Sequence, residues 1–252
     1  MKAQHLLLFV LIVNFQYLTA QIVNVESLRR VSDTSKWSGS ASLDVALIEN
    51  RRSIFRLTNR VRLQYKTENN LYLFVNDLNL QRIDENALVN RGIQHLRYNR
   101  RLNERIKLEA FTQSQYDAIS NIDFRGLIGI GPRYRLTKSD TYRVYLGTLM
   151  MYEYEKATEA NIPIIRDFRN STYASCSLYP LENLSIVSTT YYQPLVNQLS
   201  DFRISNETSI AFKILKNLSY KTTLIYHFDS RPIIGIPQTQ YELTNRIVYS
   251  FD

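Results

Sequence analysis

The chain has 252 residues, with 31 Lys and Arg against 23 Asp and Glu, and a net charge of +8 at pH 7. An excess of basic charge can indicate nucleic-acid binding, but here the basic residues are spread along the chain rather than clustered, which excludes the usual basic patch. The single cysteine, Cys176, excludes an intramolecular disulfide, and no stretch of about eighteen apolar residues follows Ala20, which excludes a transmembrane helix in the mature chain.

The first twenty residues have the form of an export signal. Met1-Lys2 supplies a basic start, an apolar run extends from Leu6 to Val13, and Ala20 is the small residue at a cleavage point. We therefore expect residues 1–20 to be a Sec-type signal peptide. Residues 21–36 are mostly polar and are expected to form a periplasmic segment or short helix before the main domain at residues 37–252.

From Trp37 onward, polar and apolar residues alternate in twelve segments. In the second and clearest segment, Arg56, Arg60 and Arg62 share one face, and the apolar residues from Phe55 to Tyr65 share the other. A strand collects such arginines on one face, whereas a helix would scatter them. The pattern predicts strands at Trp37–Glu49, Phe55–Tyr65, Leu71–Gln81, Leu88–Asn99, Arg105–Tyr116, Asp123–Leu136, Thr141–Glu155, Ile165–Tyr179, Leu184–Gln193, Phe202–Leu215, Leu218–Asp229 and Gln238–Phe251. The faces of Leu71–Gln81 and Leu184–Gln193 stay unassigned, because neither segment has one clearly polar side.

The connections between these segments alternate between tight and longer ones. The tight ones are Lys66–Asn70, Arg101–Glu104, Thr137–Asp140, Pro180–Asn183 and Lys216–Asn217, and the intervening ones lengthen to Asp117–Ile122, Lys156–Pro163, Pro194–Asp201 and Ser230–Pro237. Short periplasmic turns and longer external loops are typical of outer-membrane barrels, and an even strand count places both termini in the periplasm. Pro132 lies inside a predicted strand and predicts a bulge or local kink there.

Aromatic residues recur about ten positions apart along one face of these segments. The pairs are Tyr142 and Tyr152, Phe124 and Tyr134, Phe55 and Tyr65, and Tyr241 and Phe251. At roughly 3.3 Å per residue and a tilt of roughly 40°, ten residues rise about 25 Å, the height of the apolar band on a membrane-spanning barrel. The aromatic residues would then form girdles at both edges of that band. The sequence therefore predicts an all-β fold, a closed antiparallel β-barrel of about twelve strands in a bacterial outer membrane.

Several stretches also resemble a known family. Asp123-Phe-Arg-Gly-Leu-Ile-Gly-Ile-Gly-Pro-Arg-Tyr-Arg135 resembles the glycine-rich central strand of the outer-membrane barrels known as domain of unknown function 481. So do Phe202-Arg-Ile-Ser-Asn-Glu-Thr-Ser209 and the ending with Tyr220-Lys-Thr, Asp229-Ser-Arg-Pro232 and Val248-Tyr-Ser-Phe251. The resemblance extends over residues 37–252 and is closest to Bacteroidota members. It implies a location in the outer membrane, but it implies no substrate. Tyr249 and Phe251 resemble the terminal signal that such barrels present to their assembly machinery.

The alternation also predicts which charged residues line the lumen. The candidate lining consists of Arg56, Arg60, Arg62, Arg91, Arg97, Arg125, Arg133, Arg135, Arg143, Lys213, Glu109, Glu207 and Glu242, together with Arg169, Lys107, Lys221, Asp44 and Glu153. Such a set can fill a narrow barrel with ion pairs or leave a positive constriction that favours anions. We expect a narrow anion-leaning channel or a structural envelope barrel, with a mostly filled or narrowly open lumen.

Two other hypotheses remain at this stage. An outer-membrane hydrolase could use His227 and Asp229 at the external mouth, with the carboxylate orienting the imidazole. A soluble secreted barrel could bind an apolar ligand, although outward aromatic girdles argue against it. We expect no enzyme activity, no cofactor and no metal site. The expected partners are outer-membrane lipid and lipopolysaccharide, the barrel-assembly machinery and small anions, but not nucleic acid.

Overall fold

The computed structural model describes residues 36–49, 52–84, 86–137, 139, 141–215, 218–233 and 235–249. In these residues the chain forms twelve β-strands and one sheet. The strands are β1 (Trp37–Glu49), β2 (Ser53–Lys66), β3 (Asn70–Ile83), β4 (Asn86–Arg101), β5 (Ile106–Asp117), β6 (Ile122–Arg135), β7 (Tyr142–Ala157), β8 (Ile165–Leu181), β9 (Leu184–Leu195), β10 (Gln198–Leu215), β11 (Leu218–Asp229) and β12 (Thr239–Tyr249). Within the same residues, no helix is long and apolar enough to cross a membrane.

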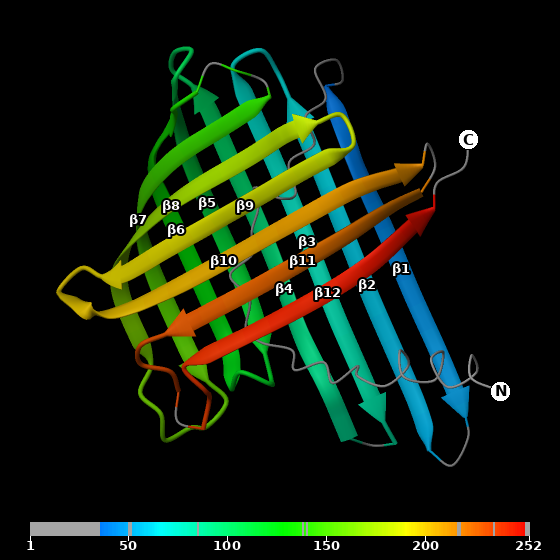
Figure 1. Cartoon of the computed structure of the whole chain (residues 1–252). Helices are drawn as coiled ribbons and strands as arrows, with labels where there is room; N and C mark the ends of the chain where they lie inside the picture. The colour runs from blue at the N-terminus through cyan, green and yellow to red at the C-terminus, as the bar shows by residue number, and fades with distance from the viewer. Residues whose placement is uncertain are drawn as a thin grey trace.

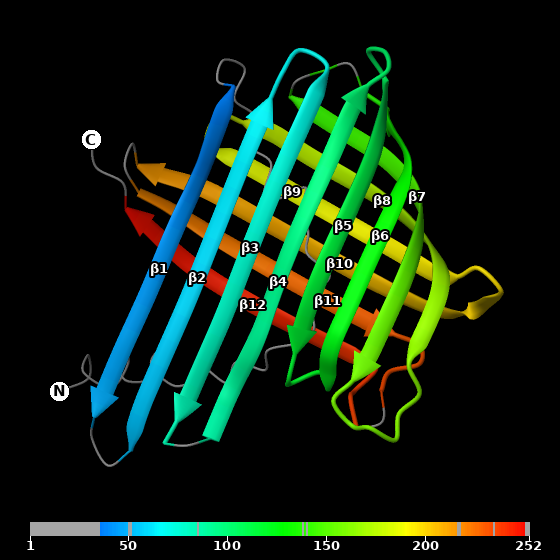
Figure 2. The ribbon, with the colours of Figure 1, turned by 180° about the vertical axis from the view of Figure 1, so that it is seen from behind.

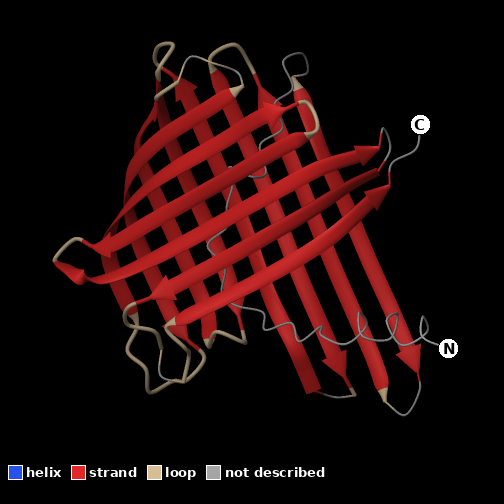
Figure 3. Ribbon diagram, viewed as in Figure 1, coloured by secondary structure: helices blue, strands red, loops and turns tan. Residues whose placement is uncertain are grey.

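Each strand pairs in antiparallel fashion with the next one along the chain, from β1 to β12 (Figure 1). The sheet curls so that β8–β12 cross in front of β1–β6, and Figure 3 shows that strands make up nearly all of the described chain. The predicted all-β architecture with twelve antiparallel strands is therefore confirmed. The described residues record no pairing between β1 and β12, so closure of the sheet into a barrel stays a prediction.

The two faces of the sheet are opposite in character. On the inner face, which the curled sheet encloses, His95 is 2% exposed and Glu109 and Glu153 are 0% exposed. On the outer face, Leu43 is 65% and Ile128 is 60% exposed. Because apolar side chains face outward and charged ones inward, this sheet inverts the arrangement of a water-soluble protein. The structure also shows which residues of β3 and β9 face inward, which the sequence did not decide. Leu73 and Val75 of β3 and Thr189 and Tyr191 of β9 are buried on the inner face.

Outward aromatic residues gather at both ends of the strands. At the end where β1 begins, Trp37 and Tyr65 have ring centroids 4.7 Å apart, and the row continues through Tyr72 to Tyr98. At the opposite end, contacts join Tyr152 to Phe168, Tyr192 to Phe202, and Phe202 to Phe228 at 5.2 to 5.6 Å. We call these two sets the terminus-end girdle and the far-end girdle. Two residues of the predicted aromatic pairs, Tyr65 and Tyr152, belong to these girdles.

Pro132 interrupts pairing without shifting it. Pro132 pairs with Leu108 of β5, but the β6–β7 ladder passes from Ile130 and its partner Met150 to Arg133 and its partner Gly147. The register is the same on both sides of this gap, so the expected bulge is not present. Proline lacks the backbone N–H that β7 would need, and the ladder accommodates the loss by omitting two positions.

The connections differ from the expected pattern in one place. The predicted long loop at Pro194–Asp201 is wrong, because β9 continues to Leu195 and β10 starts at Gln198. The ladder shifts register where Pro194 cannot donate a hydrogen bond, and pairing resumes at the tip between Gln198 and Leu195. Residues 158–164 and 230–238 form the long connections, both at the far end (Figures 1 and 2). The predictions for residues 1–20, for residues 21–35 and for Phe251 concern residues outside those that the structure describes.

Candidate functional site

The inner face carries three groups of charged residues, which differ in how their charges are matched. The first, the central cluster, consists of Arg97 of β4, Glu109 of β5, Arg133 of β6 and Tyr173 of β8. Glu109 accepts a 2.5 Å hydrogen bond from the Tyr173 hydroxyl and lies 3.7 Å from Arg97 Nη1 and 3.4 Å from Arg133 Nη1. The Arg133 guanidinium also stacks 3.9 Å from the centre of the Tyr145 ring. Because Tyr173 reaches Glu109 from three strands away, this cluster bridges the enclosed space.

The second group, the far-end cluster, lies closer to the long connections. Its members are Arg125, Glu153, Glu155, Arg169, Asp201, Arg203 and Asp229. Glu153 Oε1 lies 3.2 Å from Arg125 Nε and accepts a 2.5 Å hydrogen bond from Arg203 Nη1, while its Oε2 accepts one of 2.8 Å from Arg169 Nε. Arg203 Nε donates to Asp229 at 2.8 Å, and Arg169 Nη2 donates to Asp201 at 2.9 Å. A buried carboxylate held by three guanidinium groups forms a closed network.

Charges balance closely across these two clusters. The far-end cluster sets three arginines against four carboxylates, and the central cluster sets two arginines against one. The five cations therefore face five carboxylates. A balanced, buried network occupies space and fixes side chains, but it gives a passing anion little net attraction.

The third group, at the terminus end, consists of basic residues. We call it the basic rim: Lys66, Arg101, Lys107, Arg135, Arg143, Lys213, Lys221 and Arg246. On every described strand, the inward position nearest this end holds a residue other than Asp or Glu. Arg101 and Lys107 are direct cross-strand partners, and so are Lys221 and Arg246. Like charges directly opposite each other destabilise a sheet, so these cross-strand pairs do not by themselves stabilise the fold.

The remaining predicted lining residues are distributed along the inner face outside the two clusters. Arg60 lies 3.3 Å from Asp77 on the neighbouring strand, with both side chains about half exposed. Arg56, Arg62, Arg91, Glu207 and Glu242 occupy inward positions of β2, β4, β10 and β12. Among the predicted lining residues, Arg133 contacts Glu109 on the neighbouring strand, and Arg60 contacts Asp77.

His227 and Asp229 are close along β11 but do not form a dyad. Asp229 accepts hydrogen bonds from Arg203 Nε at 2.8 Å and from the Arg231 amide at 2.9 Å. Nε2 of the buried His227 has no hydrogen-bond partner within the described residues. Both residues border a cavity of about 80 Å³ beneath the β11–β12 connection. The contact that a hydrolase would need is thus absent here, and in the same residues no group of three or more His, Cys, Asp or Glu could hold a metal ion.

Sequence reasoning missed four members of these clusters: Tyr173, Glu155, Asp201 and Arg203. Glu155 follows Glu153 at the strand period, and Arg203 shares the inward parity of Glu207, so parity alone could have found both. Asp201 falls within the stretch predicted to be a loop. Tyr173 stands on a strand whose inward residues are mostly uncharged, so its role appears only in three dimensions.

A model of the family described as "Protein of unknown function, DUF481" matches residues 55–251. No curated protein matches the sequence. The structure titled "NanC porin structure in rhombohedral crystal form" is 10% identical, with a TM-score of 0.48 over 83% of this chain and 100% of that one. "Bacterial polysaccharide outer membrane secretin" is 13% identical, with a TM-score of 0.41 over 88% of this chain and 87% of that one.

Proposed function

The chain belongs to the DUF481 family, and from that premise we propose that it closes between β1 and β12 into a bacterial outer-membrane β-barrel with a narrow, anion-leaning passage. The apolar outer face supports the membrane location, since it would be unfavourable in water. The two girdles lie at the ends of that face, where aromatic rings meet headgroups. Closure follows from the same environment, because unpaired strand edges in lipid would cost several kcal/mol per group.

The observation that carries the anion preference is the basic rim. It places eight cations at the inner edge of one end, and an anion entering there meets positive charge before it reaches the balanced clusters. Selectivity is set by such rings when ions pass within a few ångströms, where screening is weak. The rim would concentrate anions, and the clusters beyond it would limit how many pass.

Room for a passage is provided by the small inward residues of β1. Ser40 and Ser42 occupy successive inward positions there, and both are exposed. The two clusters are contributed by β4–β11, so they fill the other side of the enclosed space. A path along the serine face of β1 would therefore be narrow and polar. If the clusters instead block it completely, the second candidate function is a structural envelope barrel.

Refolding into liposomes followed by planar-bilayer recording tests this proposal. Insertion should give a compact band on unheated SDS gels, as a closed barrel does, and the bilayer should show small conductance steps. Under a KCl gradient, the reversal potential should have the sign of chloride selectivity. Cation selectivity would contradict the anion proposal, insertion without conductance would favour the structural barrel, and failure to insert would contradict the membrane assignment.

A further inference from the structure

The outer face of β1–β8 holds an apolar groove of about 1080 Å³. Figure 2 turns this face of β1–β6 towards the viewer. Two neighbouring rows of outward residues line the groove, one running from Trp37 through Tyr98 to Met150 and the other from Leu63 through Leu96 to Phe168. This volume is slightly above the range of ~300–1,000 Å³ found for small-molecule sites.

The groove exists because β5 carries small residues between larger ones. Ala110 follows Tyr98 in the first row, and Thr112 follows Leu96 in the second. On the other side of β5 both rows continue with isoleucines of β6. The only charged residue among the lining is Arg97, whose side chain belongs to the central cluster on the inner face. The outward lining therefore suits an apolar occupant.

The groove runs from one girdle to the other. Its first row begins in the terminus-end girdle at Trp37, and its second row ends in the far-end girdle at Phe168. An occupant that enters at Trp37 would start at one headgroup level and run obliquely into the apolar band. A hydrocarbon chain attached to a headgroup has that form, because it leaves the headgroup level and extends into the hydrocarbon core.

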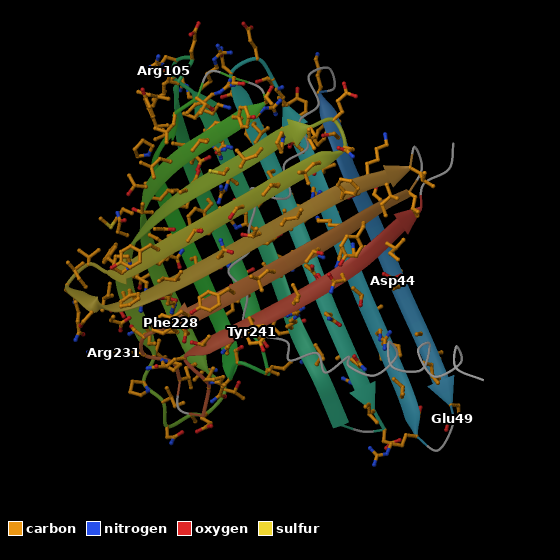
Figure 4. The ribbon with its side chains drawn as sticks, viewed as in Figure 1. Asp44, Glu49, Arg105, Phe228, Arg231 and Tyr241 are labelled. Atoms are coloured by element: carbon orange, nitrogen blue, oxygen red, sulfur yellow. The ribbon has the colours of Figure 1, made fainter. Side chains whose placement is uncertain are left out.

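Two exposed arginines lie beyond the groove lining, towards the terminus end. Arg100 is exposed, shares the outer face of β4 with Tyr98 and lies two residues beyond it. Arg105 is exposed in the β4–β5 turn, and its Nη1 donates a 3.2 Å hydrogen bond to the hydroxyl of Tyr134. This hydrogen bond raises the pKa of Arg105, so the residue stays charged. Figure 4 shows Arg105 at the opposite end of the molecule from Phe228 and Arg231.

We propose that the groove binds an acyl chain of an anionic glycerophospholipid whose phosphate is held by Arg100 and Arg105. The apolar lining suits an acyl chain. The two arginines suit an anionic headgroup, since each basic residue near a membrane surface attracts anionic lipid. The inference rests on the proposed membrane-spanning barrel. It goes beyond general lipid contact because it assigns one site and one headgroup charge.

The first test fills the groove. Ala110→Phe with Thr112→Phe places two rings in its floor, and the matched control Ala174→Phe adds a ring at an exposed outward position of β8. Native mass spectrometry of the whole chain released from detergent, titrated with phosphatidylglycerol, should show one retained lipid for the wild type. The filled variant should bind roughly tenfold more weakly, because the buried acyl surface is lost. The control should bind as the wild type does.

The second test removes the charge. Arg100→Gln with Arg105→Gln should lower affinity for phosphatidylglycerol by about fivefold per arginine, and should lower the affinity for phosphatidylcholine with the same chains by less, because its choline cation offsets the phosphate charge. Arg166→Gln, an exposed outward residue near the far end, is the control. Trp37 is the only tryptophan and lines the groove, so bromine atoms on the lipid chains should quench its fluorescence more strongly when the lipid is anionic.

The results separate this inference from the proposed function. Equal retention of both lipids, unaffected by filling, would show ordinary surrounding lipid and overturn the site. A dimer mass abolished by filling would assign the groove to a second copy of the chain and would also overturn it. If the wild type inserts into liposomes while either result is obtained, the proposed function still holds. If it does not insert, both fail.

Discussion

The far-end cluster and the basic rim occupy the same inner face and come from the same alternating pattern, yet their charges are organised in opposite ways. In the far-end cluster each guanidinium faces a carboxylate, and Glu153 alone contacts Arg125, Arg169 and Arg203. In the rim, Lys221 faces Arg246 across the ladder, and Arg101 faces Lys107. The role of an inward charged residue in this protein therefore depends on the charges of the residues around it.

One sheet interior can therefore hold both a region of paired charges and a region of like charges. Paired charges satisfy one another, so they rigidify the interior and exclude mobile ions. Like charges are unsatisfied by one another, and an anion can relieve their repulsion. The comparison predicts that charge removal is costly in the cluster and mild, or even favourable, in the rim.

The largest effect should come from breaking the cluster. Glu153→Gln leaves three buried guanidinium groups without their shared carboxylate, and this should lower the free energy of unfolding by about 3–5 kcal/mol. Urea unfolding in liposomes, followed by Trp37 fluorescence, measures it. Glu68→Gln, in the exposed β2–β3 turn, should change stability by less than about 0.5 kcal/mol and is the control. A loss below about 1 kcal/mol for Glu153→Gln would mean that the cluster does not hold the interior together.

A somewhat smaller effect should separate the outer face from the inner one. Leu243 points outward on β12 and is 56% exposed, so Leu243→Arg should cost about 2–4 kcal/mol if that face meets lipid. Lys213→Arg keeps a cation in the rim and should cost little. Similar tolerance at both positions, measured by folding into liposomes, would remove the basis for assigning lipid to one face and ions to the other.

The smallest effect should appear within the rim and should have the opposite sign. Lys221→Glu replaces a like-charge pair with an opposite-charge pair facing Arg246. Stability should rise by about 0.2–1 kcal/mol, because direct cross-strand charges interact on that scale. Lys221→Gln, which removes the repulsion without adding attraction, should give a smaller gain. Destabilisation by both changes would show that an unrecognised partner already balances Lys221.

The alternation of polar and apolar residues predicted the strands well, because this alternation depends only on residues that are neighbours in the sequence. The observed bounds of β8 and β11 lie within two residues of those expected, and both keep the expected parity. The pattern failed at β9 and β10, where Pro194 suggested a loop and the ladder instead resumed beyond a register shift. A proline in the sequence indicates that one backbone hydrogen bond of the ladder will be missing, but it does not indicate whether strand pairing restarts beyond it.

The clusters were only partly predictable for a different reason. Parity identifies Glu153 and Arg133 as inward, but the contact between Glu153 and Arg203 joins residues 50 positions apart on β7 and β10. That contact depends on how the sheet curls, which no single strand encodes. The rim likewise appears only when the ends of many strands are superimposed, although each of its cations has the correct parity in the sequence.

The reversal potentials of rim variants in planar bilayers decide whether the basic rim sets the ion preference. Arg135→Glu, Arg143→Glu and Lys213→Glu together reverse charge within the rim, and Arg82→Glu, Lys156→Glu and Arg166→Glu make the same change in net charge at exposed outward positions. If the rim sets selectivity, the first triple should shift the preference from chloride towards potassium, and the second should leave the wild-type preference unchanged. A measurable wild-type conductance whose selectivity ignores the rim triple would contradict the account.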